Sequence, residues 1–536
     1  MYLIFNLQFK NHNYISFLLA LEGDKSKIIN LGGLDVISNT IRSHIGDIDV
    51  CLKGFEALGR IVIVDTTNQK ITCETGWAEV IADAVRQHFD NVNVCKNGLI
   101  IIENIAFWSP DVERLLVKMG WVDLIKDVIK RHIDNVDICR KGLFTMDRVA
   151  SWSPDSQKAL ADMGWIEVIK NVIKKYIDNA DICQHGLITI NKIVCENPDI
   201  IGFAGKNEWI ELIGDVVKEH IVNDDICKAG FIAANNVVQK SSDIQKHSGN
   251  SEYIKLSINV IKQYIDDESL CQEGFSSLGE VICMSPDNQK LACDLRCIEL
   301  VNNAIRQHVD NAELCKNGLD VINKIIVGNV PNQKVACDAG CIEMIGDTIR
   351  LHISNGDVCT EGLAAICRIS FQNYDVQKQA CELEFVDLLF DVIDRHEDDQ
   401  DIVEEGCVCI ERLLSSQENH AKWCTEEVMR KVEEYQTKYA DSQLIRKCLA
   451  CLKREEDPRV AGAVQRGVCT KETTKCGMEN CQRDKRNHFC VGCAAQQKCF
   501  KCVECQEVCV ACCETCMRTK HSGHQMVEFF DIITYC

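Results

Sequence analysis

The amino-acid sequence predicts an all-α solenoid of roughly ten repeats, followed by a small cysteine-rich module that folds around zinc. The first observation is a period of 44 residues, in which one cysteine column is followed three residues later by a glycine column. Apolar side chains at helical spacing fill each period, and this pattern ends beyond Pro458, where cysteine becomes abundant. The two columns are Cys51, Cys95, Cys139, Cys183, Cys227, Cys271, Cys315 and Cys359, and Gly54, Gly98, Gly142, Gly186, Gly230, Gly274, Gly318, Gly362 and Gly406.

One period, residues 271–314, shows the three helices expected in every repeat. Apolar residues at helical spacing predict a long helix over residues 270–282. Ser285 is a typical N-cap, and Pro286 suits the first position of a short second helix. A third helix is expected over residues 297–308, and a turn rich in Asp and Asn leads into the next repeat.

This three-helix layout resembles armadillo repeats, and the resemblance covers about residues 7–454. It implies a right-handed superhelical solenoid of the kind found in armadillo-repeat-containing proteins and in leucine-rich-repeat kinases, although the sequence contains no kinase or leucine-rich-repeat segment. The repeated elements that carry it are Asn-Gln-Lys at 68–70, 288–290 and 332–334, and the glycine that ends the short helix, which is Gly32, Gly76, Gly120, Gly164 and Gly340.

Periodicity and composition divide the chain into three parts. Residues 1–454 form the predicted solenoid with an eroded first repeat, residues 455–468 a hinge, and residues 469–536 the zinc-binding module. Residues 1–21 lack a basic start and a small-residue cleavage site, so we expect no secretory signal. No apolar run reaches membrane-spanning length.

Net charge and cysteine content indicate which kinds of partner and which redox environment suit the protein. The net charge is −21; residues 459–536 carry 11 basic and 8 acidic side chains, or +3, which leaves −24 for the rest. Such a charge disfavours binding to nucleic acids and to anionic membranes. The chain has 35 cysteines, 22 of them among the helical repeats, where they behave as small apolar residues. A reduced, cytoplasmic location is therefore expected.

The resemblance also implies a binding groove lined by the longest helix of each repeat. The position that holds Trp in importin-type and catenin-type repeats lies two residues after the column glycine. No Trp occupies it here, which disfavours a nuclear-import role. It reads Glu56, Ile100, Phe144, Ile188, Ile232, Ser276, Asp320, Ala364 and Val408.

The position that holds Asn in those families lies six residues after the glycine and is basic in six of nine repeats. Two readings stay open at this column. A basic ladder could bind an acidic or phosphorylated segment of a partner protein, or an exposed helix position could simply accept Lys or Arg. The predicted partner-binding residues are Arg60, Asn104, Arg148, Lys192, Asn236, Lys324, Arg368 and Arg412, and Glu280 interrupts the ladder.

Two aromatic columns are expected to stabilise the stack. Histidine recurs near the end of the third helix, where its ring is predicted to cap helix-terminal carbonyls rather than to bind a metal. Trp77, Trp121, Trp165 and Trp209 are expected in the core between repeats or at its rim. The cysteine pairs 293/297 and 337/341 are also assigned to the core. The histidine column is His44, His88, His132, His220, His308, His352 and His396, with Tyr176 and Tyr264 in its gaps.

The last 78 residues contain 13 cysteines, many of them in Cys-x-x-Cys pairs. Such pairs pre-position two of the four ligands that zinc requires, and metal would supply the folding energy that so few large apolar residues cannot. We expect two or three Zn²⁺ ions; a disulfide knot is the alternative. The predicted ligands are Cys476, Cys481, Cys490, Cys493, Cys499, Cys502, Cys505, Cys509, Cys512, Cys513, Cys516, His521 and His524, with Cys469 and His488 in reserve.

Two zinc modules of the ubiquitin system resemble parts of this tail. The spacing over residues 513–524 resembles the second half of a B-box, but the gap before Cys513 is too short for its first half. The spacing over residues 490–505 resembles the degron-reading box of N-recognin ligases, but 15 residues separate Cys505 from His521 instead of about five. The pairing of residues with ions stays open.

These patterns together predict a non-catalytic scaffold or adaptor that holds a protein partner in the solenoid groove and adds a second contact through the zinc module. The alternative is a component of the ubiquitin pathway, by analogy with the two zinc boxes. Nucleic-acid binding is disfavoured because a charge of +3 and two phenylalanines make a poor phosphate-binding surface. The sequence contains no phosphate-cradling glycine loop and no nucleophile elbow, so we expect no catalysis.

Overall fold

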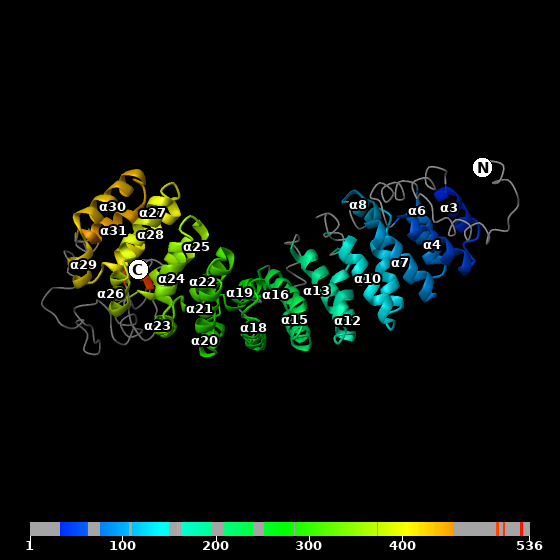
Figure 1. Cartoon of the computed structure of the whole chain (residues 1–536), viewed down its shortest axis with the longest axis horizontal. Helices are drawn as coiled ribbons and strands as arrows, with labels where there is room; N and C mark the ends of the chain where they lie inside the picture. The colour runs from blue at the N-terminus through cyan, green and yellow to red at the C-terminus, as the bar shows by residue number, and fades with distance from the viewer. Residues whose placement is uncertain are drawn as a thin grey trace. The chain divides into compact units, whose positions relative to one another are not determined.

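The computed structural model describes residues 33–62, 76–106, 110–149, 158, 160, 162–195, 208–239, 251–283, 285–371, 373–453, 500–502, 508–509 and 526–528 (Figure 1). The chain divides into two compact units. The first comprises residues 1–326 and 331–365, and the second comprises residues 327–330 and 366–536. Within the segments just named, no helix is both long and apolar enough to cross a membrane.

Successive helices follow the predicted order of long, short and third helix in each repeat. The long helices are α4 (Ile48–Val62), α7 (Val92–Ala106), α10 (Val136–Val149), α13 (Ala180–Cys195), α16 (Asp224–Gln239), α19 (Glu268–Ile282), α22 (Ala312–Ile326), α25 (Gly356–Ile369), α28 (Gln400–Leu413) and α31 (Gln443–Leu452). The short helices are α8 (Pro110–Lys118), α20 (Pro286–Asp294), α23 (Val330–Asp338), α26 (Tyr374–Glu382) and α29 (Gln417–Trp423).

The third helices are amphipathic. They are α3 (Gly33–Ser43), α6 (Trp77–Gln87), α9 (Trp121–Arg131), α12 (Trp165–Lys175), α15 (Glu208–Glu219), α18 (Ser251–Gln263), α21 (Cys297–Gln307), α24 (Cys341–Leu351), α27 (Phe385–Arg395) and α30 (Glu426–Lys438). Of these, α6, α9, α12, α21, α24 and α27 begin with an aromatic residue or a cysteine. All three helices expected in residues 271–314 are present, and the Ser285 hydroxyl accepts the predicted capping bond from Asn288 N at 3.4 Å.

Within the first unit, the long helices of consecutive repeats stack on one another from α4 to α22, and Figure 1 shows them side by side in that order. The core lies between this layer and the third helices. Trp77, Trp121 and Trp165 are buried at its centre, and the Trp121 indole N–H donates to the carbonyl of Ala78 at 3.1 Å. The tryptophan column therefore packs in the core, and a hydrogen bond ties one repeat to its predecessor.

The column glycine permits close approach between a long helix and the third helix before it. A Cβ atom added at Gly142 would lie 2.5 Å from the side chain of Ile129, and one added at Gly274 would lie 2.7 Å from Ile261. Both distances are below ordinary van der Waals contact. The strict glycine column thus reflects packing between helices, because a larger side chain would push them apart.

A left-handed residue connects the short helix to the third helix. Gly76, Gly120 and Gly340, which belong to the glycine column that ends the short helix, have φ between 72° and 77°. Arg296 and Glu384 occupy the same register with φ of 62° and 59°, although neither is a glycine. A Cβ atom makes this conformation costly, so these two repeats retain the turn at some expense of stability.

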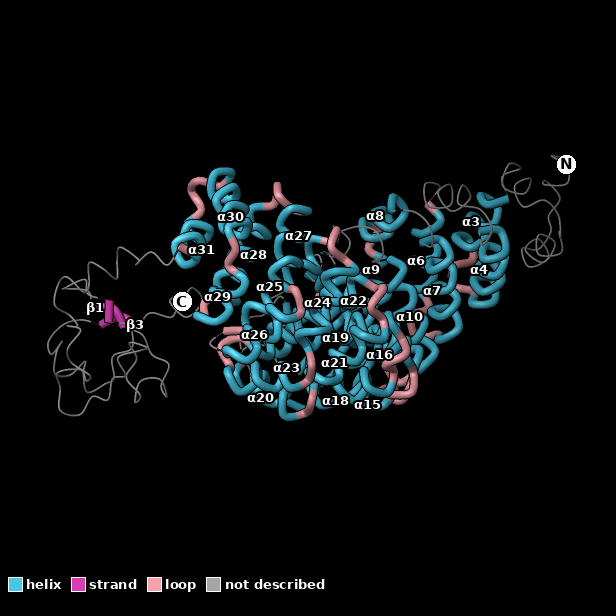
Figure 2. The backbone as a smooth tube through the Cα atoms, turned by 60° about the vertical axis from the view of Figure 1, so that its left-hand side comes forward, coloured by secondary structure: helices cyan, strands magenta, loops and turns pink. Residues whose placement is uncertain are grey.

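In the second unit, α28 packs on α27, α26 and α31, and α30 packs on α31. The carboxyl-terminal part contains three short strands, drawn in magenta in Figure 2: β1 (Phe500–Cys502), β2 (Val508–Cys509) and β3 (Met526–Glu528). Strand β1 is central and pairs antiparallel with both neighbours, with Lys501 opposite Val508 and Val527.

Candidate protein-binding face

The stacked long helices of the first unit present one side to solvent, and we call the solvent-facing side chains of α4, α7, α10, α13, α16, α19 and α22 the long-helix face. Helical periodicity places its residues in three rows, one for each successive turn of a helix. The first row lies near the helix starts, the middle row two residues after the column glycine, and the third row six residues after it. The predicted partner-binding residues of this unit occupy the third row.

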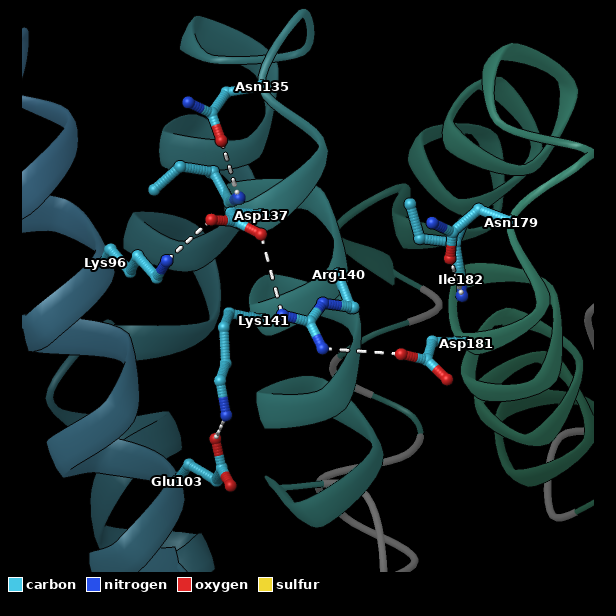
Figure 3. Close-up of polar contacts among 10 residues, drawn as sticks. Lys96, Glu103, Asn135, Asp137, Arg140, Lys141, Asn179, Asp181 and Ile182 are labelled. Carbon is cyan, nitrogen blue, oxygen red and sulfur yellow. Dashed lines mark hydrogen bonds and ion pairs between the residues drawn. The ribbon is translucent and has the colours of Figure 1, made fainter.

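The first row is a chain of alternating charges that links α7, α10 and α13 (Figure 3). Lys96 Nζ lies 2.6 Å from Asp137, and Arg140 lies 3.5 Å from Asp137 and 3.3 Å from Asp181 in the next repeat. The Lys96 ammonium holds the pKa of Asp137 below its usual range. These groups are half-exposed, so the ion pairs add little to the free energy of unfolding, and their main effect is to fix the register of neighbouring helices.

Asparagine caps set the start of the same helices. The Asn135 side chain accepts a hydrogen bond from Ile138 N at 3.1 Å, and Asn179 accepts one from Ile182 N at 3.1 Å. Figure 3 shows both caps beside the charge chain. The Asp/Asn-rich turn seen in the sequence is therefore an N-cap signal that recurs with the period.

The middle row is apolar across four consecutive long helices. Ile100, Phe144, Ile188 and Ile232 are each half-buried and lie at equivalent positions on α7, α10, α13 and α16. We call these four residues the apolar stripe. On α19 and α22 the same position holds Ser276 and Asp320, so the stripe ends there.

Phe144 lies at the centre of a cluster of cations. Lys141 Nζ is 5.3 Å and the Arg148 guanidinium 5.0 Å from the ring centroid, and the His185 ring packs edge-on with centroids 4.5 Å apart. Lys141 also pairs with Glu103 on α7 at 3.0 Å. This cluster around an aromatic ring was not identified from the sequence, because the position of Lys141 and His185, directly before the column glycine, varies in residue type from repeat to repeat.

The predicted ladder lies in the third row, but several of its members bind acidic groups of the protein itself. Lys192 forms an ion pair with Asp147 of the preceding repeat, which is 7% exposed. Burial alone would raise the pKa of Asp147, but the His185 ring, whose Nδ1 lies 3.5 Å from the carboxylate, and the Lys192 ammonium hold that pKa below its usual range. Asp147 therefore stays ionised and neutralises Lys192.

Lys324 also forms ion pairs with carboxylates of the protein itself. Its ammonium lies 2.9 Å from Glu280 and 2.8 Å from Asp320. Burial opposes the charged form, yet the two carboxylates raise the pKa of Lys324 to about 12. Glu280, which interrupts the ladder, is thus the partner of the next residue in the same column.

The remaining ladder residues differ in environment. Arg60 is exposed and pairs with Glu56 at 2.8 Å, and Asn104 is half-buried. The Asn236 side-chain amide binds Asn191 of the preceding repeat. In the second unit, Arg368 is half-buried, and Arg412 donates to the carbonyl of Cys367 at 2.8 Å. The structure does not test whether these side chains bind a partner.

The histidine column binds carbonyl groups, as predicted, and the acceptors belong to the preceding repeat. His88 Nε2 lies 2.6 Å from Ile45 O, His132 Nε2 lies 2.7 Å from Phe89 O, and His352 Nε2 lies 2.6 Å from Val309 O. Because a carbonyl only accepts, the ring nitrogen donates. Tyr176 replaces histidine and donates through its hydroxyl to Ile133 O at 2.9 Å.

The column cysteines are buried and hydrogen-bonded. Cys95 Sγ lies 3.3 Å from Phe89 O, and Cys271 Sγ lies 3.5 Å from Tyr264 O. Burial raises the pKa of Cys95 to about 11 and that of Cys271 to about 12. Near neutral pH, a thiol in that state is a poor nucleophile and a poor metal ligand, because its thiolate is scarce.

Among the described residues, no group of three or more His, Cys, Asp or Glu side chains could hold a metal. Cys297 and Cys341 are buried in the core. The side chains of the predicted zinc ligands lie outside the described residues; for Cys502 and Cys509 the backbone positions in β1 and β2 are described. Zinc binding by the tail stays a prediction.

Comparison with known proteins supports the fold. No family model matches the sequence, and no curated protein matches it. A crystal structure of an engineered protein is similar, with a TM-score of 0.65, 13% identity, and coverage of 78% of this chain and 98% of that chain. A structure from work on a phosphorylation switch that controls the interaction between cadherin and beta-catenin is also similar, with a TM-score of 0.68, 12% identity, and coverage of 85% and 90%.

At these identities the likeness shows the fold alone. Beta-catenin is an armadillo-repeat protein, so the chain has an armadillo-like helical repeat fold. Folds of this kind typically serve as protein-interaction scaffolds.

Proposed function

We propose that the chain is a non-catalytic scaffold whose long-helix face binds an extended segment of a partner protein. The observation that carries the proposal is the apolar stripe of Ile100, Phe144, Ile188 and Ile232, which crosses four consecutive repeats beside basic and amide side chains. Apolar side chains with polar neighbours of this kind are typical of the centre of a protein interface.

The partner segment should carry apolar side chains for the stripe and acidic or phosphorylated side chains for its basic border. Lys141 and Arg148 lie over the Phe144 ring, and Lys192 extends from the next repeat. Because Asp147 and Glu103 already pair with two of these cations, a partner carboxylate or phosphate must compete with them. Binding should therefore weaken as salt concentration rises.

A displayed library of unstructured peptides tests this proposal. We expect the full chain to enrich peptides that combine aromatic or aliphatic residues with acidic ones, and Phe144→Ala to lose most of that enrichment. Val222→Ser is the matched control, because Val222 is 82% exposed and lies in the turn before α16, outside the apolar stripe. Equal enrichment by the wild type and Phe144→Ala would reject the face as the binding site.

We also propose that the cysteine-rich tail binds two or three zinc ions and forms a second contact module. The ligand spacing from Cys476 to His524 supports it. Metal content of the reduced full chain, measured by mass spectrometry before and after chelation, tests it; no bound zinc would reject the module. A subsequent ubiquitin-transfer assay would separate a simple contact module from the alternative, a zinc box that assists a ligase.

A further inference from the structure

The second unit contains two thiols in direct contact. Cys367 on α25 and Cys409 on α28 are both 1% exposed or less, and their sulfur atoms lie 2.7 Å apart. Neither residue forms a disulfide bond. This separation is shorter than an ordinary contact between two sulfur atoms, so little movement is needed to join them.

No column of the repeat brings these two residues together. They are 42 residues apart, whereas the equivalent position one period after Cys367 is Glu411. Elsewhere in the described helices, column cysteines such as Cys359 donate to backbone carbonyls of their own turn. The contact between Cys367 and Cys409 is therefore an addition to the repeat pattern rather than a consequence of it.

We propose that Cys367 and Cys409 are a modification site, at which a hydroperoxide oxidises the two thiols to a disulfide that joins α25 to α28. One thiolate attacks a peroxide oxygen, which gives a sulfenic acid and releases water after proton transfer. The second sulfur then displaces the hydroxyl group, the S–O bond breaks, the S–S bond forms, and a second water leaves. Two thiols and one peroxide thus give one disulfide and two waters.

Burial determines which oxidants can act. A fully buried pair is closed to bulky disulfide reagents, whereas hydrogen peroxide is close to water in size. Burial and the hydrogen bond from Cys367 raise the pKa of Cys409 well above its usual range, so its thiolate is scarce near neutral pH. We therefore expect slow oxidation that accelerates as pH rises.

Peptide mapping of the full chain tests the proposal. The reduced protein is treated with hydrogen peroxide, unfolded in N-ethylmaleimide, digested without reductant and analysed by mass spectrometry. We expect a cross-linked peptide that contains Cys367 and Cys409, lacks two hydrogen atoms relative to the reduced peptides, and disappears after treatment with dithiothreitol. Cys359→Ser, which removes a buried thiol of the same helix, should leave this peptide unchanged, whereas Cys409→Ser should abolish it.

Two outcomes would overturn the inference. One is alkylation of Cys367 and Cys409 to the same extent as Cys359 at every peroxide dose. The other is a disulfide between Cys409 and a different cysteine, such as Cys448, whose thiol hydrogen-bonds with that of Cys407. Both are read from the wild-type chain, so a variant that fails to fold does not affect the result.

Discussion

Single residues in this protein act through the repeat to which they contribute, and the column glycine is the clearest case. Gly142 has no space for a methyl group, because Ile129 of the preceding helix occupies the position that a Cβ atom would take. Gly59, in the last turn of α4, has nothing within 4 Å of the same position. Helix packing therefore requires glycine at position 142, whereas it does not require glycine at position 59.

Alanine substitutions at these glycines should change stability in opposite directions. Gly142→Ala should destabilise the fold by about 1–2 kcal/mol, because overpacking outweighs the gain in helix propensity. Gly59→Ala should stabilise it by up to about 1 kcal/mol through propensity alone. Urea denaturation monitored by circular dichroism measures both. A stabilising Gly142→Ala would contradict the packing explanation of the column.

Lys324 provides a second prediction for a single side chain. Lys324→Gln leaves the carboxylates of Glu280 and Asp320 together without their cation, and should destabilise the fold by about 1–3 kcal/mol. Lys96→Gln is the control, because the ion pair of Lys96 with Asp137 is half-exposed and its loss should change stability much less. Equal effects of the two substitutions in thermal unfolding would show that burial of the pair does not matter.

The connection between the short helix and the third helix determines stability at the scale of elements. It requires a left-handed residue, which glycine supplies at Gly340 and a carboxylate-bearing residue supplies at Glu384. The turn is the same in both repeats, so the backbone rather than the side chain is what the fold specifies. Exchanging glycine and non-glycine residues at this position therefore measures the free energy that the left-handed conformation costs a residue with a Cβ atom.

Glu384→Gly should stabilise the protein by about 0.5–1 kcal/mol, because relief of the left-handed strain exceeds the added entropy of the unfolded chain. Gly340→Ala should destabilise it by about 1 kcal/mol for the converse reason. Thermal melting of the two variants beside the wild type provides the measurement. If both substitutions move the midpoint in the same direction, the strain does not lie in the backbone.

Across the whole molecule, the buried thiols make stability depend on alkaline pH. Burial raises the pKa of Cys139 from 9.0 to about 11 and that of Cys315 from 9.0 to about 12. The unfolded chain releases these protons near pH 9, whereas the folded chain holds them. The stabilisation is therefore complete below about pH 9 and is lost as pH rises toward 11–12.

A pKa raised by about two units, as for Cys139, corresponds to a loss of at most about 3 kcal/mol. We expect the unfolding midpoint to be nearly constant between about pH 6 and pH 9 and to fall above pH 9, measured by circular dichroism across a pH series. Cys139→Ala should make the unfolding midpoint fall less steeply above pH 9, because one of the buried thiols is removed. A midpoint that stays level to about pH 11 would disprove the assigned role of burial.

Much of this architecture could be predicted from the sequence, because equivalent positions in successive 44-residue repeats carry similar residues and adopt the same local structure. The Ser285 cap, the tryptophan core and the carbonyl-binding histidines all followed from spacing and residue type. The left-handed Arg296 could not be predicted, because a non-glycine residue gives no signal of that conformation.

The binding face was predicted less completely than the fold. The column that contains Lys192 and Lys324 was identified, but its partners were not, because Asp147 lies one position out of register and Glu280 was interpreted as an interruption. The contact between Cys367 and Cys409 also departs from the period. The 44-residue period predicts the contacts that recur in every repeat, whereas contacts out of register depend on the packing of individual side chains.

The hydrogen bonds between neighbouring repeats affect how the number of repeats can change during evolution. His132 reaches Phe89 and Trp121 reaches Ala78, each across 43 residues, so every such bond joins a unit to its immediate predecessor. Duplication or excision of one whole period would join residues that already occupy equivalent positions and would leave each remaining bond with a partner. A gene that encodes such a chain can therefore lengthen or shorten its product by recombination between its own repeats.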